Sequence, residues 1–418
     1  MRRGLFVRTR KGEGAAPRHF RFAGARRVVA LASVGFILAS LGAAAGDNLS
    51  RPIGKALFER AWVPAPSSTK ANDGLGPLFN ARACAYCHQG LDRAISQRDP
   101  DGTFTQRGMV LKLSDAAGRF DPNYGGQLQT SAVPGLVPEG RLVVAGAAPQ
   151  IQNLVSGPLA PTTRMGVRAA PSVRGLGLLA GVPEEAILAH ADPDDRDGDG
   201  ISGRPNWITD ANGTKHLGRF GLKSSSATLA AQTELAFSLD LGMSTFGHPN
   251  LAGDCLSAAC RTAPHGGTVD EAEIRQDLVA MLADYLAGVP PLEPASPPDA
   301  GGELLFAAAG CASCHTPSLP RAKGEVHAFS DLLLHDLGPD LDGGATEPNV
   351  APTEWRTAPL WGVSRALATH AGLLHDGRAP GVAEAIALHG GEGAGARTRF
   401  GELGESDRAR LIRYVEGL

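Results

Sequence analysis

Two short segments of this chain combine cysteine and histidine at the same spacing. Residues 84–88 read CAYCH and residues 311–315 read CASCH, so both follow the pattern Cys-x-x-Cys-His. Two thiols at this spacing can each add to a vinyl group of haem, and the histidine that follows can bind the iron. We therefore predict two covalently bound haem c groups. Their thioether bonds would come from Cys84, Cys87, Cys311 and Cys314, and their proximal iron ligands would be His88 and His315.

Cysteines at this spacing could instead form a redox dithiol or supply half of a zinc site. Neither alternative explains why histidine follows the second cysteine in both copies. The repetition of the whole five-residue pattern therefore favours haem.

The ligand on the other side of each iron decides whether a haem only transfers electrons or also binds a substrate. No methionine follows Met281, so the second haem cannot have a methionine ligand from its own domain. The pattern Glu-Ala-Ile-x-x-His ends at His389 and also at His190, which suggests equivalent helices in the two halves. We favour His389 as the distal ligand of the second haem and keep a surface or propionate-bonding role as its alternative. The competing downstream histidines are His327, His335, His370 and His375.

An acidic turn at residues 192–200 reads DPDDRDGDG and resembles the first half of a calcium-binding loop. Oxygen atoms at Asp195, Asp197 and Asp199 could face one cation, and Gly200 would allow a sharp turn. The match is partial, because the twelfth position holds Asn206 rather than a bidentate glutamate. A calcium ion is thus a third candidate cofactor, and a solvated acidic turn is the alternative.

Several helices are expected around the two motifs. Helix starts near Ser50 and near Gly302, each upstream of a motif, suggest an internal duplication with one haem per half. The sequence at 268–271 is a capping box that predicts the start of a helix, and residues 290–298 are a proline-rich linker. The last helix, from about residue 406, should pack across the helix before the second motif. Cys255 and Cys260 should form a local disulfide if the protein is exported.

Residues 1–45 have the composition of an export signal. They contain nine of the chain's basic residues and one acid, then an apolar run and three alanines. That run is shorter than a membrane span, so we expect cleavage and no span in the mature chain, with an uncleaved anchor as the alternative. Without this segment 31 basic and 42 acidic residues remain, a net charge near −11. Such an acidic chain argues against nucleic acid and favours a basic redox partner in the periplasm or another exported location.

Five further segments resemble the di-haem oxidoreductase family, which is often described as peroxidase-like. They are GLGPLFNAR at 74–82, DGISGRPN at 199–206, GRFG at 218–221, LLLHD at 332–336 and LHDGR at 374–378. The C-terminal half is also similar to bacterial di-haem cytochrome c peroxidases. In those enzymes the helix after the His-Asp-Gly turn carries the ligand of the electron-transfer haem, and His389 occupies that place here. The resemblance implies an active-site glutamine and glutamate, for which Gln127, Gln129 and Glu139 are the candidates.

These observations predict a mainly α fold of two cytochrome c-like haem domains with long irregular loops and inserted segments. The expected divisions are a signal peptide at 1–45, an N-terminal haem domain with an inserted acidic loop region at 46–290, and a C-terminal haem domain at 291–418. The leading function is peroxide reduction at the first haem, with electrons relayed through the second from a small redox protein. A non-catalytic electron carrier with two six-coordinate haems is the alternative, and oxidation of thiols or protein side chains is a third.

Overall fold

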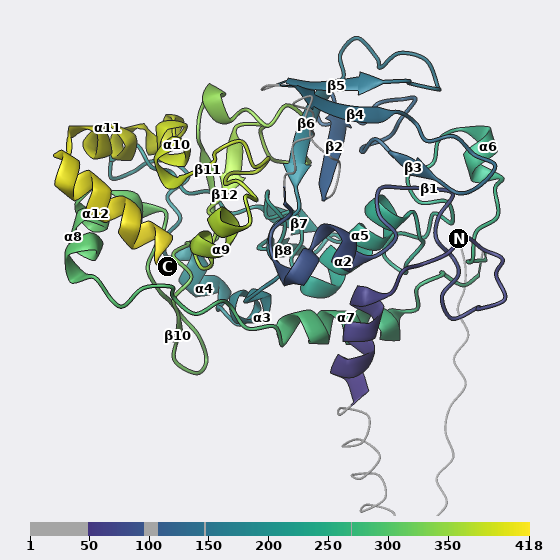
Figure 1. The fold of residues 1–418 in the computed structure, drawn as a ribbon, viewed down its shortest axis with the longest axis horizontal. Coiled ribbons are helices and arrows are strands. Elements are labelled where there is room, and N and C mark those ends of the chain that lie inside the picture. Colours follow the sequence, from purple (N-terminus) through teal and green to yellow (C-terminus); the bar gives the residue numbers. More distant parts are fainter. Residues whose placement is uncertain (1–48, 96–107, 146–147, 269) are drawn as a thin grey trace, which may run out of the picture. The chain divides into compact units, whose positions relative to one another are not determined.

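The computed structural model describes residues 49–95, 108–145, 148–268 and 270–418, and Leu49–Leu418 form one compact unit (Figure 1). The expected signal peptide lies outside the described residues. The predicted domain boundary near residue 290 stays a prediction. In the part of the chain that the structure describes, no helix has the length and apolar character needed to cross a membrane.

The architecture mixes short helices with small antiparallel sheets, so it is not mainly α as the sequence suggested. Residues 49–59 are helical. The other α-helices of the described residues are α2 (Cys84–Cys87), α3 (Leu176–Ala180), α4 (Glu184–Leu188), α5 (Leu229–Leu241), α6 (Ala258–Arg261), α7 (Gln276–Ala287), α8 (Ala300–Ala308), α9 (Val363–Ala368), α10 (Val382–Ala387), α11 (Ala394–Glu402) and α12 (Glu405–Glu416). Short 3-10 turns lie at Gln89–Leu91, Cys311–Ser313, Pro339–Leu341 and Gly391–Gly393.

The strands of the described residues are short, and each pairs with one other strand to form a two-stranded sheet. The antiparallel pairs are β1 (Leu78–Phe79) with β3 (Ser131–Ala132), β2 (Met109–Ser114) with β6 (Arg164–Ala169), β4 (Arg141–Ala145) with β5 (Ala148–Gln152), β7 (Trp207–Thr209) with β8 (Lys215–Leu217), β9 (Leu319–Pro320) with β10 (Glu325–Val326), and β11 (Leu334–Asp336) with β12 (Glu354–Arg356).

Two helix crossings in the structure have a similar glycine-centred geometry. Gly302 of α8 lies against Tyr414 of α12, where a Cβ atom would come within 2.6 Å of the tyrosine Cβ. Gly54 of helix 49–59 lies in the same way against Met281 and Tyr285 of α7, where a Cβ would approach the Met281 carbonyl oxygen to 2.2 Å. Glycine is required at both positions because the backbones approach so closely. The predicted packing of the last helix on the helix before the second motif is thereby confirmed.

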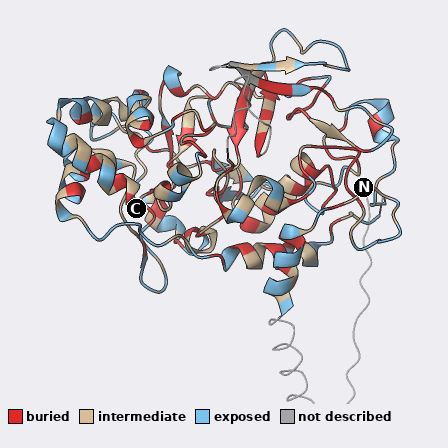
Figure 2. Ribbon diagram, in the orientation of Figure 1, coloured by how far each residue is buried: buried red, intermediate tan, exposed pale blue. Residues whose placement is uncertain are grey.

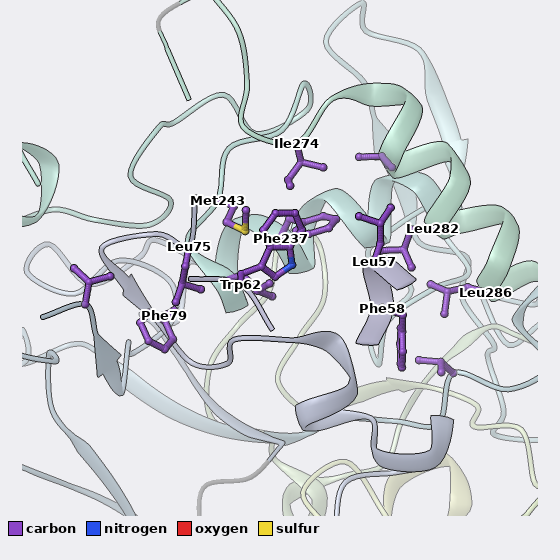
Figure 3. Close-up of a cluster of buried hydrophobic side chains, with 14 residues drawn as sticks. Leu57, Phe58, Trp62, Leu75, Phe79, Phe237, Met243, Ile274, Leu282 and Leu286 are labelled. Atoms are coloured by element: carbon purple, nitrogen blue, oxygen red, sulfur yellow. The ribbon is translucent and has the colours of Figure 1, made fainter. Parts of the chain in front are cut away.

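Each crossing also places a phenylalanine against the histidine of the nearby motif. The Phe58 and His88 rings lie 6.4 Å apart, and the Phe306 and His315 rings lie 6.5 Å apart. Phe58 belongs to a buried apolar cluster with Trp62 and Phe237 (Figure 3). Phe306 belongs to a second cluster that includes residues of α12. The two motifs are therefore supported by separate apolar cores, each of which includes one helix crossing. Figure 2 shows that buried residues occur both in the helices and in the strands and loops between them.

One predicted helix start is wrong. The backbone N–H of Glu271 donates to Thr268 Oγ1 at 3.1 Å, as a capping box would require, but the helix α7 begins only at Gln276. Bends occupy the chain before α7, and Ile274 forms a bridge in which its N–H donates to the carbonyl of Ser244 at 3.0 Å. The tertiary contact thus delays the helix by more than one turn. The predicted disulfide between Cys255 and Cys260 is confirmed.

Candidate functional site

Both Cys-x-x-Cys-His motifs line the same cavity, which has a volume of about 560 Å³. The first motif enters it from α2, and the second enters it from the 3-10 turn after α8. Apolar residues of α5 and α10 form much of the remaining wall. Sequence segments more than 200 residues apart therefore meet around one interior space.

The two motif histidines have the same geometry. His88 Nδ1 lies 2.8 Å from the carbonyl oxygen of Pro171, and His315 Nδ1 lies 2.8 Å from the carbonyl oxygen of Phe329. Because a carbonyl can only accept, Nδ1 carries the proton in each ring and Nε2 keeps its lone pair. Burial lowers the pKa of His88, and it lowers the pKa of His315 to about 4. Both histidines are thus neutral imidazoles prepared to bind a metal through Nε2.

The four motif cysteines are free thiols in this structure. Burial, reinforced by the nearby Asp240 carboxylate, raises the pKa of Cys84 and of Cys87 to about 12. Burial likewise raises the pKa of Cys311 to about 11. A catalytic dithiol requires a lowered thiol pKa, so these surroundings disfavour that alternative.

His389 follows the end of α10 and lines the cavity on the side of the second motif, where its charge would influence His315. Its Nδ1 lies 2.7 Å from the carbonyl oxygen of Ala385, four residues earlier. Burial lowers the pKa of its ring. Like the proximal histidines, His389 is therefore a neutral imidazole with Nδ1 bonded to a carbonyl and Nε2 free to bind a metal. His190, its counterpart after the end of α4, is exposed and outside the cavity lining.

His335 also lines the cavity, but both of its ring nitrogens are hydrogen bonded. Nε2 lies 2.8 Å from Asp331 Oδ2, and Nδ1 lies 2.6 Å from Glu392 Oε2 and 3.6 Å from Cys314 Sγ. Burial opposes the charged ring, yet the bonds to Asp331, Cys314 and Glu392 raise the pKa of His335 to about 12. This ring is an imidazolium held between two carboxylates, so neither nitrogen is free to bind iron.

His375 is the other histidine of the second half that lines the cavity; His327 and His370 are exposed and lie outside the lining. The His375 ring stacks on Trp355 with 3.9 Å between ring centres and 11° between planes. Burial and then the positive charge of Arg168 lower the pKa of His375. Asp376 does not hold this ring, since the closest approach of its carboxylate is 3.8 Å. His375 is therefore a neutral imidazole fixed by stacking.

The glutamine and glutamate candidates separate in space. Gln127 lines the cavity, donates from Nε2 to Asp240 Oδ1 at 2.8 Å, and leaves its buried Oε1 without a partner among the described residues. Gln129 instead donates to the carbonyls of Gln127 and Leu239 behind the cavity wall. Glu139 accepts the Gln129 N–H at 2.7 Å, and burial raises its pKa to about 8. Gln129 and Glu139 thus brace the segment that carries Gln127, and only Gln127 faces the site.

The acidic turn lies on the surface of the protein. Carboxylate oxygens of Asp195, Asp197 and Asp199 lie within 4.8 Å of one another, and all three residues are exposed. Asn206 donates from its side chain to the carbonyls of Lys223 and Ser224, so it takes no part in the turn. The three aspartates expected as calcium ligands therefore lie close together. Asn206, at the twelfth loop position, bonds elsewhere.

A family model described as "Di-haem oxidoreductase, putative peroxidase" matches residues 146–418. The chain belongs to the di-haem oxidoreductase family. No curated protein matches the sequence. Among solved structures, the chain is similar to Kuenenia stuttgartiensis hydrazine synthase pressurised with xenon, at 14% identity and a TM-score of 0.39, with 88% of this chain and 87% of that chain covered. The family assignment depends on the family model.

The residues of this di-haem oxidoreductase fit the two haems that its family name implies. Each motif supplies a neutral histidine with a free Nε2 and two free thiols in an apolar cavity. The separate apolar cores provide one supporting crossing for each group. Asp240, Glu392 and Trp355 were not found from the sequence, because no local motif marks them and only the fold brings them to the cavity.

Proposed function

We propose that this di-haem oxidoreductase is an exported c-type cytochrome that reduces hydrogen peroxide at the first haem and receives electrons through the second. Two cytochrome c-like halves would each attach one haem through the cysteines of its motif. The equivalent crossings of helix 49–59 with α7 and of α8 with α12 support these halves. The signal-like residues 1–45 and the acidic remainder of the chain support export and a basic small redox protein as the electron donor.

The observation that carries the proposal is the difference between the two motifs. At the second motif, His389 lines the cavity with Nδ1 already bonded, which suits a second iron ligand. At the first motif, Gln127 and Asp240 line the cavity, and neither is a strong iron ligand. Haem iron with two strong ligands exchanges electrons, whereas haem iron with an open position also binds peroxide. The first site is thus suited to chemistry and the second to electron transfer.

The reaction needs two electrons and two protons to convert one hydrogen peroxide into two water molecules. Gln127 Oε1 can accept a hydrogen bond from peroxide, because it has no other partner among the described residues. Asp240 holds the Gln127 amide at 2.8 Å and offers a carboxylate that can hold and return a proton. Gln127 therefore orients the substrate, and Asp240 moves the proton.

The alternative function, a non-catalytic electron carrier, is favoured by His375. Its neutral ring lines the same cavity and could bind the first iron as a second strong ligand. Both haems would then be six-coordinate, and peroxide would find no open position. This alternative predicts two low-spin haems, and replacement of His375 by alanine would create a high-spin one.

A spectroscopic titration with peroxide separates these functions. The holoprotein should show one high-spin and one low-spin ferric haem by electron paramagnetic resonance, and it should consume peroxide with a reduced donor. Asp240→Asn should slow peroxide consumption by roughly 10²–10⁴-fold, the usual contribution of a general acid–base group. Asp277→Asn on the exposed surface of α7 is the matched control. Two low-spin haems that ignore peroxide would refute the enzyme and support the carrier.

A further inference from the structure

Arg93 is a partly buried cation near the first motif, and no carboxylate of the described residues bonds to its Nε or Nη2 atom. It lines the cavity, and its Nε and Nη2 atoms have no hydrogen-bond partner among the described residues. The acid that influences it most is Asp376. Both Asp376 oxygens already accept hydrogen bonds from Arg378, at 3.1 Å from its backbone N–H and at 2.6 Å from Nε. Within the described part of the chain, the Arg93 guanidinium therefore has no carboxylate of its own.

Arg356, near the second motif, also lacks a carboxylate partner among the described residues. It lines the cavity, donating from Nε to the Gly221 carbonyl at 2.9 Å and from Nη1 to the Thr357 carbonyl at 3.0 Å. The acid that influences it is Asp331. Asp331 already accepts the Leu333 N–H at 3.0 Å on Oδ1 and His335 Nε2 at 2.8 Å on Oδ2. Neutral carbonyls bind this guanidinium, but no carboxylate does so in the described part of the chain.

Each arginine is tied to the backbone that positions one motif. The residue after Arg93, Ala94, donates its N–H to the carbonyl of Ala170, beside the Pro171 carbonyl that holds His88. Thr357, the residue after Arg356, donates its N–H to Leu333, in the segment whose Asp331 N–H donates to the Cys314 carbonyl. Each motif is therefore accompanied by one cavity-lining arginine that is linked to its supporting backbone.

A buried and unpaired guanidinium is costly unless an anion joins it. Burial lowers the pKa of both Arg93 and Arg356 to about 10, which shows how poorly the protein alone solvates them. The cavity that they share also holds the motifs, and every haem carries two propionate carboxylates. Arginine binds carboxylates in a planar, often bidentate geometry.

We propose that Arg93 and Arg356 bind haem propionates, Arg93 that of the haem at the first motif and Arg356 that of the haem at the second. The inference rests on the two haems of the proposed function, but it does not depend on the substrate. A cation beside a propionate destabilises ferric haem relative to ferrous haem. Each arginine therefore raises the reduction potential of its own haem.

The test is a redox titration of the holoprotein and of Arg93→Gln and Arg356→Gln, after mass spectrometry has established two haems in each. Each variant should shift one of the two reduction steps to a lower potential, and the two variants should shift different steps. The propionate bending band in resonance Raman spectra should change in each. Arg93→Lys and Arg356→Lys keep the charge and should restore most of the potential. Arg164→Gln removes an arginine paired with Asp342 outside the cavity lining and should change neither step.

Unchanged potentials and Raman bands in both glutamine variants would overturn the inference, as would lysine variants that shift as far as the glutamine variants. A free small carboxylate is the competing ligand. If added acetate shifts the potentials of the dialysed wild-type protein, and Arg93→Gln abolishes that shift, the arginines bind a free anion and the propionate assignment is wrong. Peroxide is absent from all of these measurements, so a failure of the peroxidase proposal would leave their result unaffected.

Discussion

Replacing Glu392 by glutamine should destabilise the protein in a manner that depends on pH. The Glu392 carboxylate accepts hydrogen bonds from His335 Nδ1 at 2.6 Å, Ser202 Oγ at 2.8 Å, and the backbone N–H groups of Ser202 and Asp336 at 3.1 and 3.0 Å. Its side chain is 12% exposed, so solvent screens these bonds little. Four donors from two segments of the chain thus converge on one carboxylate beside the second motif.

The magnitude follows from the pKa of this carboxyl group. Burial alone would raise the pKa, but the hydrogen bond from His335 and the other donors hold the pKa of Glu392 at about 2, against 4.5 for an ordinary glutamate. A lowered pKa in the folded state stabilises that state above pH 4.5, and the stabilisation is lost as the pH falls toward 2. The lowered pKa of Glu392 therefore contributes ~3 kcal/mol to the free energy of unfolding at pH 7 and ~1.4 kcal/mol at pH 3.

Denaturant unfolding followed by circular dichroism from pH 7 to pH 3 measures this difference. Glu392→Gln should be less stable than wild type by about 3 kcal/mol at pH 7 and by less than half of that at pH 3. Glu402→Gln, a change at an exposed position of α11, controls for the loss of a charge. A difference that stays constant over this range, or falls below ~0.5 kcal/mol at pH 7, would refute the ionic role of Glu392.

The other predictions concern the cofactors. Cys311→Ala should weaken or abolish covalent attachment of the second haem alone, and a variant whose mass still shows two haems that resist acid–acetone extraction would contradict the motif assignment. His389→Met should keep the second haem low-spin and raise its reduction potential, because a thioether favours ferrous iron more than imidazole does. His389→Ala should give a new high-spin signal, and unchanged spectra in both variants would place the ligand elsewhere. Calcium should raise the melting temperature of wild type but not of Asp197→Asn. If calorimetry detects no calcium binding, the acidic turn is not a calcium site.

Features that depend on neighbours along the chain could be predicted from the sequence. The two motifs, the local disulfide between Cys255 and Cys260, and the helix before the second motif are local patterns, and the structure contains that disulfide and that helix. The similar helix starts near Ser50 and Gly302 also indicated the two glycine-centred helix crossings. The family match then supported the two haems that the motifs predict.

The tertiary structure decided which side chains reach the cavity and in which state they arrive. His335 and His389 are both histidines downstream of the same motif, and the sequence offers no measure of their ring partners. The fold gives His335 two carboxylates and His389 one backbone carbonyl, so only His389 keeps a ligand atom. Asp240 and Arg93 likewise matter because distant segments enclose them. Coordination and charge depend on distances across the fold, and local sequence patterns do not specify those distances.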